Sequence, residues 1–526
     1  MATPKISPRF TLFLLILLAF LLRLPNLGYS FYGDEEFSLL RDSDYFWTHS
    51  DDCHRPVFFT LLFLWRTIGF DGEIGLRLLP LIFGLLSVPL VWAVGHRLGG
   101  RSFALGFGLL LATSPVHIEF SQELRMYSLL VLLALAQLLC YLDYRERRRF
   151  STLALGALVG LIGMYTHLFY GFCLGGFALL ALLDRRTIRW KSYWISIVAV
   201  ALLYLPNLGN VLWFYSMRNV EYSVHLPSAL PKLAASLAVG FNLFELPELG
   251  QGRGIGWQIV VENWYYVLPC ILVFGLLLIG AIRTFAQSSE RFALSLTVAL
   301  LVVPTLLAYG FALATKKNIM GPKYLIFLLP FVLLLFVWGF QGVQRRLLQI
   351  SLGILYSLII GLSLIHFYTD SVHYGRRMNW HAAADYLTER IGSEAPVVLL
   401  QGYAERLLKY YGYETRPYWL RVYGGGDSIG VSEYLPYLQE KLTRAREVYY
   451  LREDDLQNAV DPNDIVLKTL RVVGTDETCI QYNPRLQLYG WKLHRREEGS
   501  ATFPESRIAE NSLWPHPSAV RRNPLR

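Results

Sequence analysis

The chain has 526 residues, of which 54% are hydrophobic and only 17% charged, and its formal net charge is +9. A soluble protein of this size carries about a quarter of its residues as charged side chains, so a wholly soluble fold is excluded. Many Arg and Lys residues fall in short loops between apolar segments, where they set membrane topology, so the positive charge does not indicate nucleic-acid binding.

Apolar runs recur from residue 9 to residue 368, and the remainder has the composition of a soluble domain. Because about 20 apolar residues span a bilayer core, we predict an α-helical polytopic membrane protein with about 11 transmembrane helices. The predicted spans are 9–27, 75–95, 102–118, 124–143, 152–167, 168–184, 193–213, 264–284, 293–314, 323–343 and 348–368. The run 152–184 is interrupted near His167 and is compatible with two short spans or with one span and a re-entrant piece.

The charge of the loops predicts the orientation of these spans. Basic residues gather in alternate loops, such as 145–149 and 185–191, and acidic residues gather in the others. Under the positive-inside rule the N-terminus is cytoplasmic, and the protein is a multi-pass protein of the cytoplasmic (inner) membrane. The same alternation places the C-terminal domain on the outer, exoplasmic face. No small-x-small cleavage site follows the first apolar run, which favours a retained signal anchor.

The first outer loop, residues 28–74, contains Asp34, Glu35 and Glu36 shortly after the first span. Ionisable groups at such a place are functional candidates. Adjacent carboxylates raise one another's proton affinity, so Asp34 is a candidate general base and Glu35 its neighbour in catalysis, with Glu36 a bystander. The alternative is a purely structural role at a helix N-terminus, where acidic residues are favoured.

The same loop contains His54 and Arg55 before an apolar stretch, Pro56–Trp65, that is too short to span. This stretch predicts a helix lying along the membrane surface. His54 and Arg55 are candidates for phosphate or acceptor binding, since Arg pairs with phosphate in a forked geometry; the alternative is an interfacial anchor.

Two further polar groups lie at outer ends of predicted spans. Glu123, Arg125 and Tyr127 belong to the motif Ser121–Ser128; if this motif is helical, Glu123 and Tyr127 share one face. Lys323 and Tyr324 precede the tenth span, and basic residues there depart from the positive-inside trend, which favours an anionic ligand such as a lipid phosphate. Snorkelling collars and plain surface charge are the alternatives.

The C-terminal region alternates predicted helices and strands. Residues 380–387 and 405–411 read as helices, and residues 396–400 and 447–451 read as strands, which predicts a small α/β domain. The predicted domains are therefore a transmembrane domain at 1–368, an exoplasmic α/β domain at 369–498 and a flexible tail at 499–526.

In their order and topology, these motifs resemble the membrane glycosyltransferases of the GT-C fold. The likeness rests on Asp34-Glu35, on His54-Arg55-Pro56-Val57, on Ser121–Ser128 and on Pro322-Lys323-Tyr324, and it covers about residues 10–370. The chain is most similar to the bacterial branch (glycosyltransferase family 39) related to protein O-mannosyltransferases and to the lipid A aminoarabinose transferase. Two departures stand out: the family more often has Pro where this chain has Arg55, and Arg where it has Lys323.

The resemblance implies transfer of a hexose or pentose from a polyprenyl-phosphate carrier to an acceptor hydroxyl. Asp34 would deprotonate the acceptor, Glu35 would support it or bind a cation, and Arg125 and Lys323 would hold the carrier phosphate. No cofactor is expected, apart from a divalent cation near Asp34 and Glu35 as an open alternative. The expected partners are the polyprenyl-linked sugar, a lipid, glycan or protein acceptor, and membrane lipids, without nucleic acid.

Three other functions compete with this one. A transporter of polyprenyl-linked glycans would need polar residues near mid-membrane and commonly has repeated halves, and neither is evident here. A polymerase or ligase of such glycans commonly uses a large outer loop late in the chain, whereas the acidic loop here comes early. The third alternative is a scaffold that carries an outer sensor domain.

Overall fold

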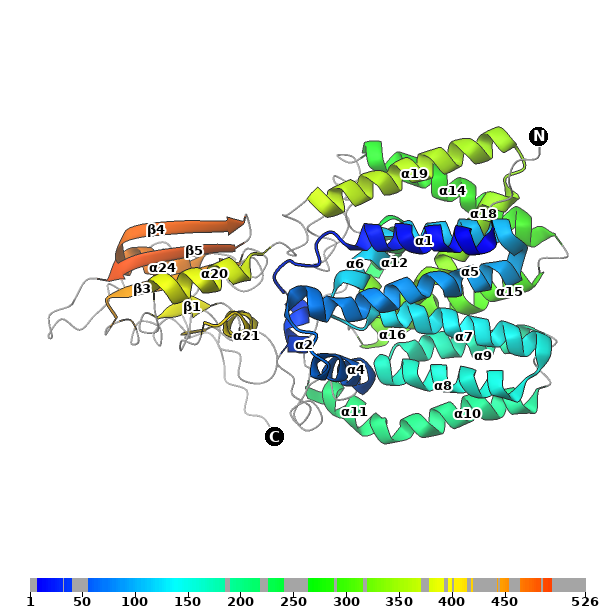
Figure 1. Ribbon diagram of the computed structural model, residues 1–526, viewed down its shortest axis with the longest axis horizontal. Helices are drawn as coiled ribbons and strands as arrows, with labels where there is room; N and C mark the ends of the chain where they lie inside the picture. The colour runs from blue at the N-terminus through cyan, green and yellow to red at the C-terminus, as the bar shows by residue number, and fades with distance from the viewer. Residues whose placement is uncertain are drawn as a thin grey trace.

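The computed structural model describes most of the membrane region and the core of the C-terminal domain (Figure 1). The described residues are 7–31, 33–39, 55–184, 190–217, 226–240, 264–287, 291–315, 319–369, 378–391, 396–399, 402–413, 418–419, 442, 445–453, 464–483 and 486–493. His54 and the predicted tail 499–526 lie outside these ranges.

The first half of the membrane region begins with α1 and continues through two short turns into longer helices. Its elements are α1 (Pro8–Arg23), η1 (Gly33–Glu35), α2 (Glu36–Leu39), α4 (Pro56–Thr67), α5 (Gly72–Thr113), α6 (Pro115–Gln122), α7 (Tyr127–Arg147), α8 (Phe150–Thr166) and α9 (Tyr170–Leu183). The helix predicted at 56–65 is present as α4, and its position along the membrane surface stays a prediction.

The second half contains the remaining apolar helices. They are α10 (Lys191–Tyr204), η2 (Leu205–Asn207), α11 (Leu208–Met217), α12 (Leu226–Val239), α14 (Trp264–Ala286), α15 (Arg291–Thr297), η6 (Val298–Val302), α16 (Val303–Thr315), α17 (Pro322–Leu325), η7 (Ile326–Leu328), α18 (Leu329–Gly342) and α19 (Arg346–Thr369). Among the described residues, seven helical segments are long and apolar enough to cross a membrane. The multi-pass architecture is thus confirmed, while the count of eleven spans stays a prediction.

Helix α5 contains two of the predicted spans because it bends at a pair of glycines. Gly100 has φ of +75°, and Gly99 is also outside the helical region, so the chain reverses there without a Cβ clash. The predicted span 102–118 is wrong at its end, since α5 stops at Thr113. Ser114 caps a new helix by accepting the backbone N–H of His117 (3.4 Å), and Pro115 takes the first helical position, a common way to start a helix.

The run 152–184 forms two helices, α8 and α9. They are separated at His167, whose backbone is extended (φ −160°, ψ 128°). Both helices are shorter than the candidate spans of the described residues. The two alternatives, two short spans or one span and a re-entrant piece, therefore both stay predictions.

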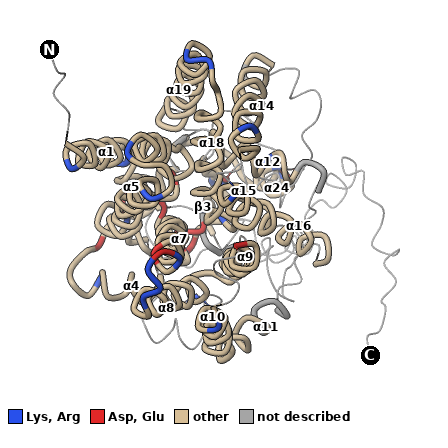
Figure 2. Tube along the Cα trace, turned by 90° about the vertical axis from the view of Figure 1, so that its right-hand side faces the viewer, with Lys and Arg blue, Asp and Glu red and all other residues tan. Residues whose placement is uncertain are grey.

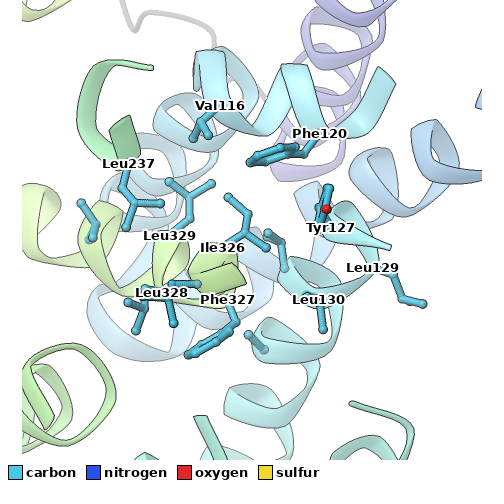
Figure 3. Close-up of a cluster of buried hydrophobic side chains, with 14 of the residues drawn as sticks. Val116, Phe120, Tyr127, Leu129, Leu130, Leu237, Ile326, Phe327, Leu328 and Leu329 are labelled. Atoms are coloured by element: carbon cyan, nitrogen blue, oxygen red, sulfur yellow. The ribbon is translucent and has the colours of Figure 1, made fainter. Parts of the chain in front are cut away.

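The centre of the helical body is formed by α7 and by the continuous segment α17–η7–α18. These are the most buried of the candidate spans, whereas the segment Lys191–Leu212 and helix α19 are the least buried. Figure 3 shows Ile326–Leu329 packed with Leu130 of α7, Val116 and Phe120 of α6, and Leu237 of α12. The peripheral helices therefore present their apolar side chains outward, as lipid contact requires.

Glycines allow α14 and α18 to approach closely. A Cβ built on Gly280 would lie 2.2 Å from the carbonyl oxygen of Gly339, and one on Gly342 would lie 1.8 Å from the oxygen of Gly280. Small residues at helix contacts are the usual means of packing in membranes, where hydrophobic burial gives little drive.

Charged residues are sparse along the helices, which are drawn almost entirely tan in Figure 2. Two ion pairs join helix ends on the side predicted to be cytoplasmic. Arg97 of α5 pairs with Asp143 of α7 at 2.8 Å, and Arg145 of α7 pairs with Asp184 after α9.

The C-terminal region contains a five-stranded sheet of order β2-β1-β3-β5-β4. β1 is parallel to β2 and β3, while β5 is antiparallel to β3 and β4. Its elements are α20 (Trp380–Tyr386), η8 (Leu387–Ile391), β1 (Val397–Leu399), α21 (Gly402–Tyr410), β2 (Tyr418–Trp419), β3 (Glu447–Glu453), α24 (Ile465–Val473), β4 (Gly474–Asn483) and β5 (Leu486–Leu493). The expected helices and strands of an α/β fold are therefore present, and Figure 1 shows this part beyond the end of the helical body where α2 and α4 lie.

Candidate functional site

The segment that carries the three acidic residues is shaped by Arg77 of α5. Its guanidinium donates to the carbonyl oxygens of Leu27 (2.8 Å), Tyr29 and Ser30 (3.3 Å) and lies 4.7 Å from the centroid of the Phe31 ring. Arg77 is only 3% exposed. One buried arginine therefore fixes the backbone that leads from α1 to Asp34.

Glu35 is the carboxylate partner of Arg77. The two side chains form a forked pair, with Nε to Oε1 at 2.9 Å and an Nη to Oε2 at 2.6 Å. Oε1 also accepts the backbone N–H of Leu124 at 2.8 Å, and Glu35 is 1% exposed. Of the roles expected for Glu35, these contacts favour support of Asp34 over direct chemistry, because both oxygens are engaged inside the protein.

Asp34 points instead toward Lys323. Its Oδ2 lies 2.6 Å from the Nζ of Lys323, and each side chain is 37% exposed. Asp34 is in the short turn η1, and Lys323 is in the first turn of α17. The pair therefore joins the candidate base to one of the candidate phosphate ligands at a partly open place.

The direction in which the pKa of Asp34 is shifted differs from the one expected from the sequence. The Lys323 ammonium lowers the pKa of Asp34 most; burial opposes this, and the guanidinium groups of Arg125 and Arg55 lower the pKa further, so that it falls well below its usual range. The expected rise in proton affinity from adjacent carboxylates is wrong for this state of the protein. The cations Lys323, Arg125 and Arg55 act on Asp34, while the neighbouring Glu35 and Glu36 are each paired with a different arginine.

Arg125 and its neighbours occupy a bend between two helices. α6 ends at Gln122, residues 123–126 are not helical, and α7 begins at Tyr127. The condition under which Glu123 and Tyr127 would share a helical face is therefore not met, because the helix is interrupted between them.

The bend nevertheless brings Arg125 toward the site. The Cζ of Arg125 lies 5.5 Å from the centroid of the Phe59 ring in α4, and its charge acts on Asp34. Glu123 and Arg125 are both almost fully buried, and the backbone N–H of Arg125 donates to the Glu123 carbonyl at 2.7 Å. Four segments thus meet here, namely η1, α4, the bend 123–126 and α17.

Arg55 and Tyr324 are two further candidate residues near this meeting point. Arg55 precedes α4 and lowers the pKa of Asp34. The Tyr324 ring lies 5.3 Å from the Nζ of Lys323 and packs near His167 (6.1 Å) and Phe169 (5.9 Å). His54, the remaining candidate, lies outside the described residues.

Sequence reasoning missed two supports of the site, Arg77 and Arg23. Arg23 ends α1 fully buried and donates to Ser121 Oγ (3.2 Å) and to the Ala112 carbonyl (3.1 Å), with one Nη 2.8 Å from His117 Nδ1. An arginine within an apolar helix was the available signal, since intramembrane charges demand partners.

A divalent cation would need oxygen ligands around Asp34. Among the described residues, no cluster of three His, Cys, Asp or Glu side chains is arranged to hold a metal ion. Glu35 is committed to Arg77 and Leu124, so it does not fit as a ligand in this arrangement.

Comparison with known proteins gives one match to a sequence family. The model of the family described as dolichyl-phosphate-mannose-protein mannosyltransferase matches residues 53–210. The resemblance drawn from the motifs is thus confirmed for this part of the chain, which contains Arg55, Glu123, Arg125 and Tyr127. No curated protein matches the sequence significantly.

Three solved structures show a distant likeness to this chain. ArnT from Cupriavidus metallidurans in the apo state is 12% identical, with 92% of this chain and 97% of that chain covered and a TM-score of 0.43. The archaeal oligosaccharyltransferase AglB from Archaeoglobus fulgidus is 11% identical, with coverages of 90% and 72% and a TM-score of 0.49. The arabinofuranosyltransferase AftD from Mycobacteria is 14% identical, with coverages of 93% and 42% and a TM-score of 0.44.

Proposed function

We propose that this protein is a membrane glycosyltransferase that moves a sugar from a polyprenyl-phosphate carrier to an acceptor hydroxyl at the outer face of the inner membrane. The observation that carries the proposal is the ion pair of 2.6 Å between Asp34 and Lys323, with Arg125 and Arg55 acting on the same carboxylate. The family match over residues 53–210, whose description names a dolichyl-phosphate sugar, supports the choice of donor.

The chemistry of such a transfer needs two opposite charges close together. Negative charge gathers on the departing phosphate in the transition state, and preorganised cations there lower the barrier. On the other side, a base accepts the proton of the attacking hydroxyl. Asp34 supplies the base, while Lys323, Arg125 and Arg55 supply the cations from three other segments. In-line attack by the hydroxyl oxygen, with departure of the phosphate, inverts the anomeric carbon.

The Asp34–Lys323 ion pair makes the proton affinity of Asp34 depend on whether the donor is bound. With no donor present, Lys323 holds Asp34 ionised and therefore ready to accept a proton. When a carrier phosphate arrives, it competes for the Lys323 ammonium, and the loss of this partner raises the proton affinity of Asp34. The base would thus become strongest when the donor is in place.

The position of the site fits a reaction at the membrane boundary. Asp34 follows α1, and Lys323 opens the segment that ends in α18, so both lie at helix ends. The C-terminal domain contacts this same end through the ion pair of Arg406 with Glu36.

The proposal is tested with purified protein and a radiolabelled polyprenyl-phosphate sugar, supplied with a cell-envelope extract as source of acceptors. Transfer of label to an acceptor, dependent on Asp34, is the expected result. A transporter or a scaffold would leave the label on the carrier, and that result would overturn the assignment. Anomeric analysis of the product then checks inversion.

A further inference from the structure

We propose that the C-terminal α/β domain completes the transfer site, because its helix α21 holds the segment that carries Asp34, and that Arg406 is the positioning residue in this contact. The inference rests on the proposed function, in which Asp34 is the base. It gives the α/β domain a role in the reaction that none of its sequence motifs indicates.

The central contact is between Arg406 and Glu36. An Nη of Arg406 lies 3.2 Å from Oε2 of Glu36, which is 0% exposed. The guanidinium also lies 5.3 Å from the centroid of the Phe37 ring. A carboxylate this deeply buried needs a cationic or hydrogen-bonding partner to remain charged, and in this contact the partner comes from the α/β domain.

Further contacts tie the domain to the residues just before Asp34. The backbone N–H of Phe31 donates to the hydroxyl of Tyr411 at 2.8 Å, and the Phe31 ring meets Tyr410 edge-on at 5.3 Å. The backbone N–H of His381 in α20 donates to Ser30 Oγ at 3.3 Å. Ser30, Phe31, Glu36 and Phe37 are therefore contacted by α20, by α21 and by the residue that follows α21.

The helical body also holds this segment. Glu35 pairs with Arg77 of α5, and Ser38 Oγ donates to the Leu124 carbonyl at 2.9 Å. Asp34 lies between these two sets of contacts and faces Lys323. The pose of the base is thus set by the membrane helices and the α/β domain together.

This arrangement predicts what loss of Arg406 does. Glu36 would keep a buried charge without this cation, so the segment would shift to hydrate it. A displacement of about 1 Å at a reacting group can cost roughly 100-fold in rate. The donor phosphate ligands Arg125 and Lys323 lie on other elements, so donor binding should be largely retained.

The experiment compares full-length Arg406→Gln and Arg406→Lys with a matched control, Arg471→Gln. Arg471 belongs to α24 of the same domain and pairs with Glu477 of β4 at 2.7 Å, with its side chain 48% exposed. We expect Arg406→Gln to lower kcat roughly 10- to 100-fold with donor KM changed less than about threefold, Arg406→Lys to recover most of the rate, and Arg471→Gln to match the wild type. A kcat of Arg406→Gln within twofold of the wild type would overturn the proposal.

A double-mutant cycle shows whether Arg406 acts through Glu36. Partners in one ion pair give non-additive effects, whereas independent sites add. We expect Glu36→Gln combined with Arg406→Gln to be no worse than the more damaged single variant. Additive losses would mean that Arg406 does not work through this carboxylate, and would overturn the assigned role.

Amide hydrogen exchange tests the contact without any activity. Peptides covering residues 30–39 should exchange faster in Arg406→Gln than in the wild type. In Arg471→Gln they should exchange at the wild-type rate. Unchanged exchange would refute the docking contact. If the wild type transfers no sugar while this exchange difference is seen, the proposed function fails and the docking contact stands, so the two failures are distinguishable.

Discussion

Asp34 and Lys323 form an ion pair of 2.6 Å although 289 residues separate them along the chain. The pair links η1, which follows the first membrane helix, to α17, which comes late in the chain. An anion that binds the Lys323 ammonium must either share that ammonium with the Asp34 carboxylate or displace the carboxylate from it.

Replacing Asp34 by Asn should abolish most of the transfer activity. A general base contributes roughly 10²- to 10⁴-fold to a rate, so we expect kcat to fall by about that factor while the donor still binds. The measurement is single-turnover transfer of labelled sugar, with donor affinity measured separately. Asp71→Asn, an exposed carboxylate in the same loop, serves as the control and should behave as the wild type; near-native transfer by Asp34→Asn would rule out its role as base.

Replacing Lys323 by Gln should move the acidic limb of the pH profile upward. Lys323 is the largest cause of the lowered pKa of Asp34, with Arg125 and Arg55 adding to it. The reaction needs the Asp34 carboxylate, which is lost as pH falls through its pKa. Without the Lys323 ammonium that pKa is higher, so activity declines at a higher pH.

The profile of kcat/KM against pH measures this effect, and Lys323→Arg should keep the limb near its original position. Lys323→Gln should also lower kcat/KM at its optimum by roughly 10²- to 10³-fold, since a charge-stabilising donor is lost. A lower kcat/KM with an unmoved acidic limb would separate phosphate binding from the ion pair.

Replacing Arg77 by Met should destabilise the fold more than an ordinary ion-pair loss. The Arg77–Glu35 pair is almost fully buried, and removing one partner of such a pair costs about 3–5 kcal/mol. Thermal unfolding in detergent measures it. Lys492→Gln, which breaks an exposed pair with Asp476, should cost no more than about 1 kcal/mol; equal effects of the two variants would contradict the structural role given to Arg77.

Two glycines of α14 offer a matched test of helix packing. A Cβ at Gly280 would lie 2.2 Å from the Gly339 oxygen, whereas a Cβ at Gly275 meets nothing within 4 Å. We expect Gly280→Ala to destabilise the protein by about 1–3 kcal/mol through overpacking. Gly275→Ala should be neutral or slightly stabilising, because Ala favours a helix by roughly 0.5–1 kcal/mol over Gly. Thermal unfolding distinguishes them, and equal midpoints would contradict the close approach of α14 and α18.

The helices were predictable because long apolar runs leave a chain in a bilayer few alternatives. Each predicted span corresponds to helical residues, and the short apolar helix α4 was predicted within a few residues of its bounds. The break at Ser114–Pro115 was missed because the apolar run continues through it. Whether the motif Ser121–Ser128 is helical was left as a condition, and the structure shows that residues 123–126 are not helical.

The site was predictable in its residue types but not in its electrostatics. Asp34, Arg125 and Lys323 were each selected from their place at a span end, and the structure brings all three within electrostatic range. The direction of the Asp34 pKa was wrong because it depends on which cation faces each carboxylate. Lys323, Arg77 and Arg406 come from distant parts of the chain, and no local pattern assigns them to Asp34, Glu35 and Glu36. The catalytic role of these residues stays a prediction.

The buried guanidinium of Arg23 has a consequence for how the protein is assembled. Its partners Ala112 and Ser121 are synthesised 89 and 98 residues later. Until then α1 carries a charge that hydrocarbon does not solvate. We expect the newly inserted first helix to remain beside the insertion machinery until α5 and α6 emerge. Crosslinking of stalled nascent chains measures this contact. The crosslink should be lost once residue 122 has left the ribosome.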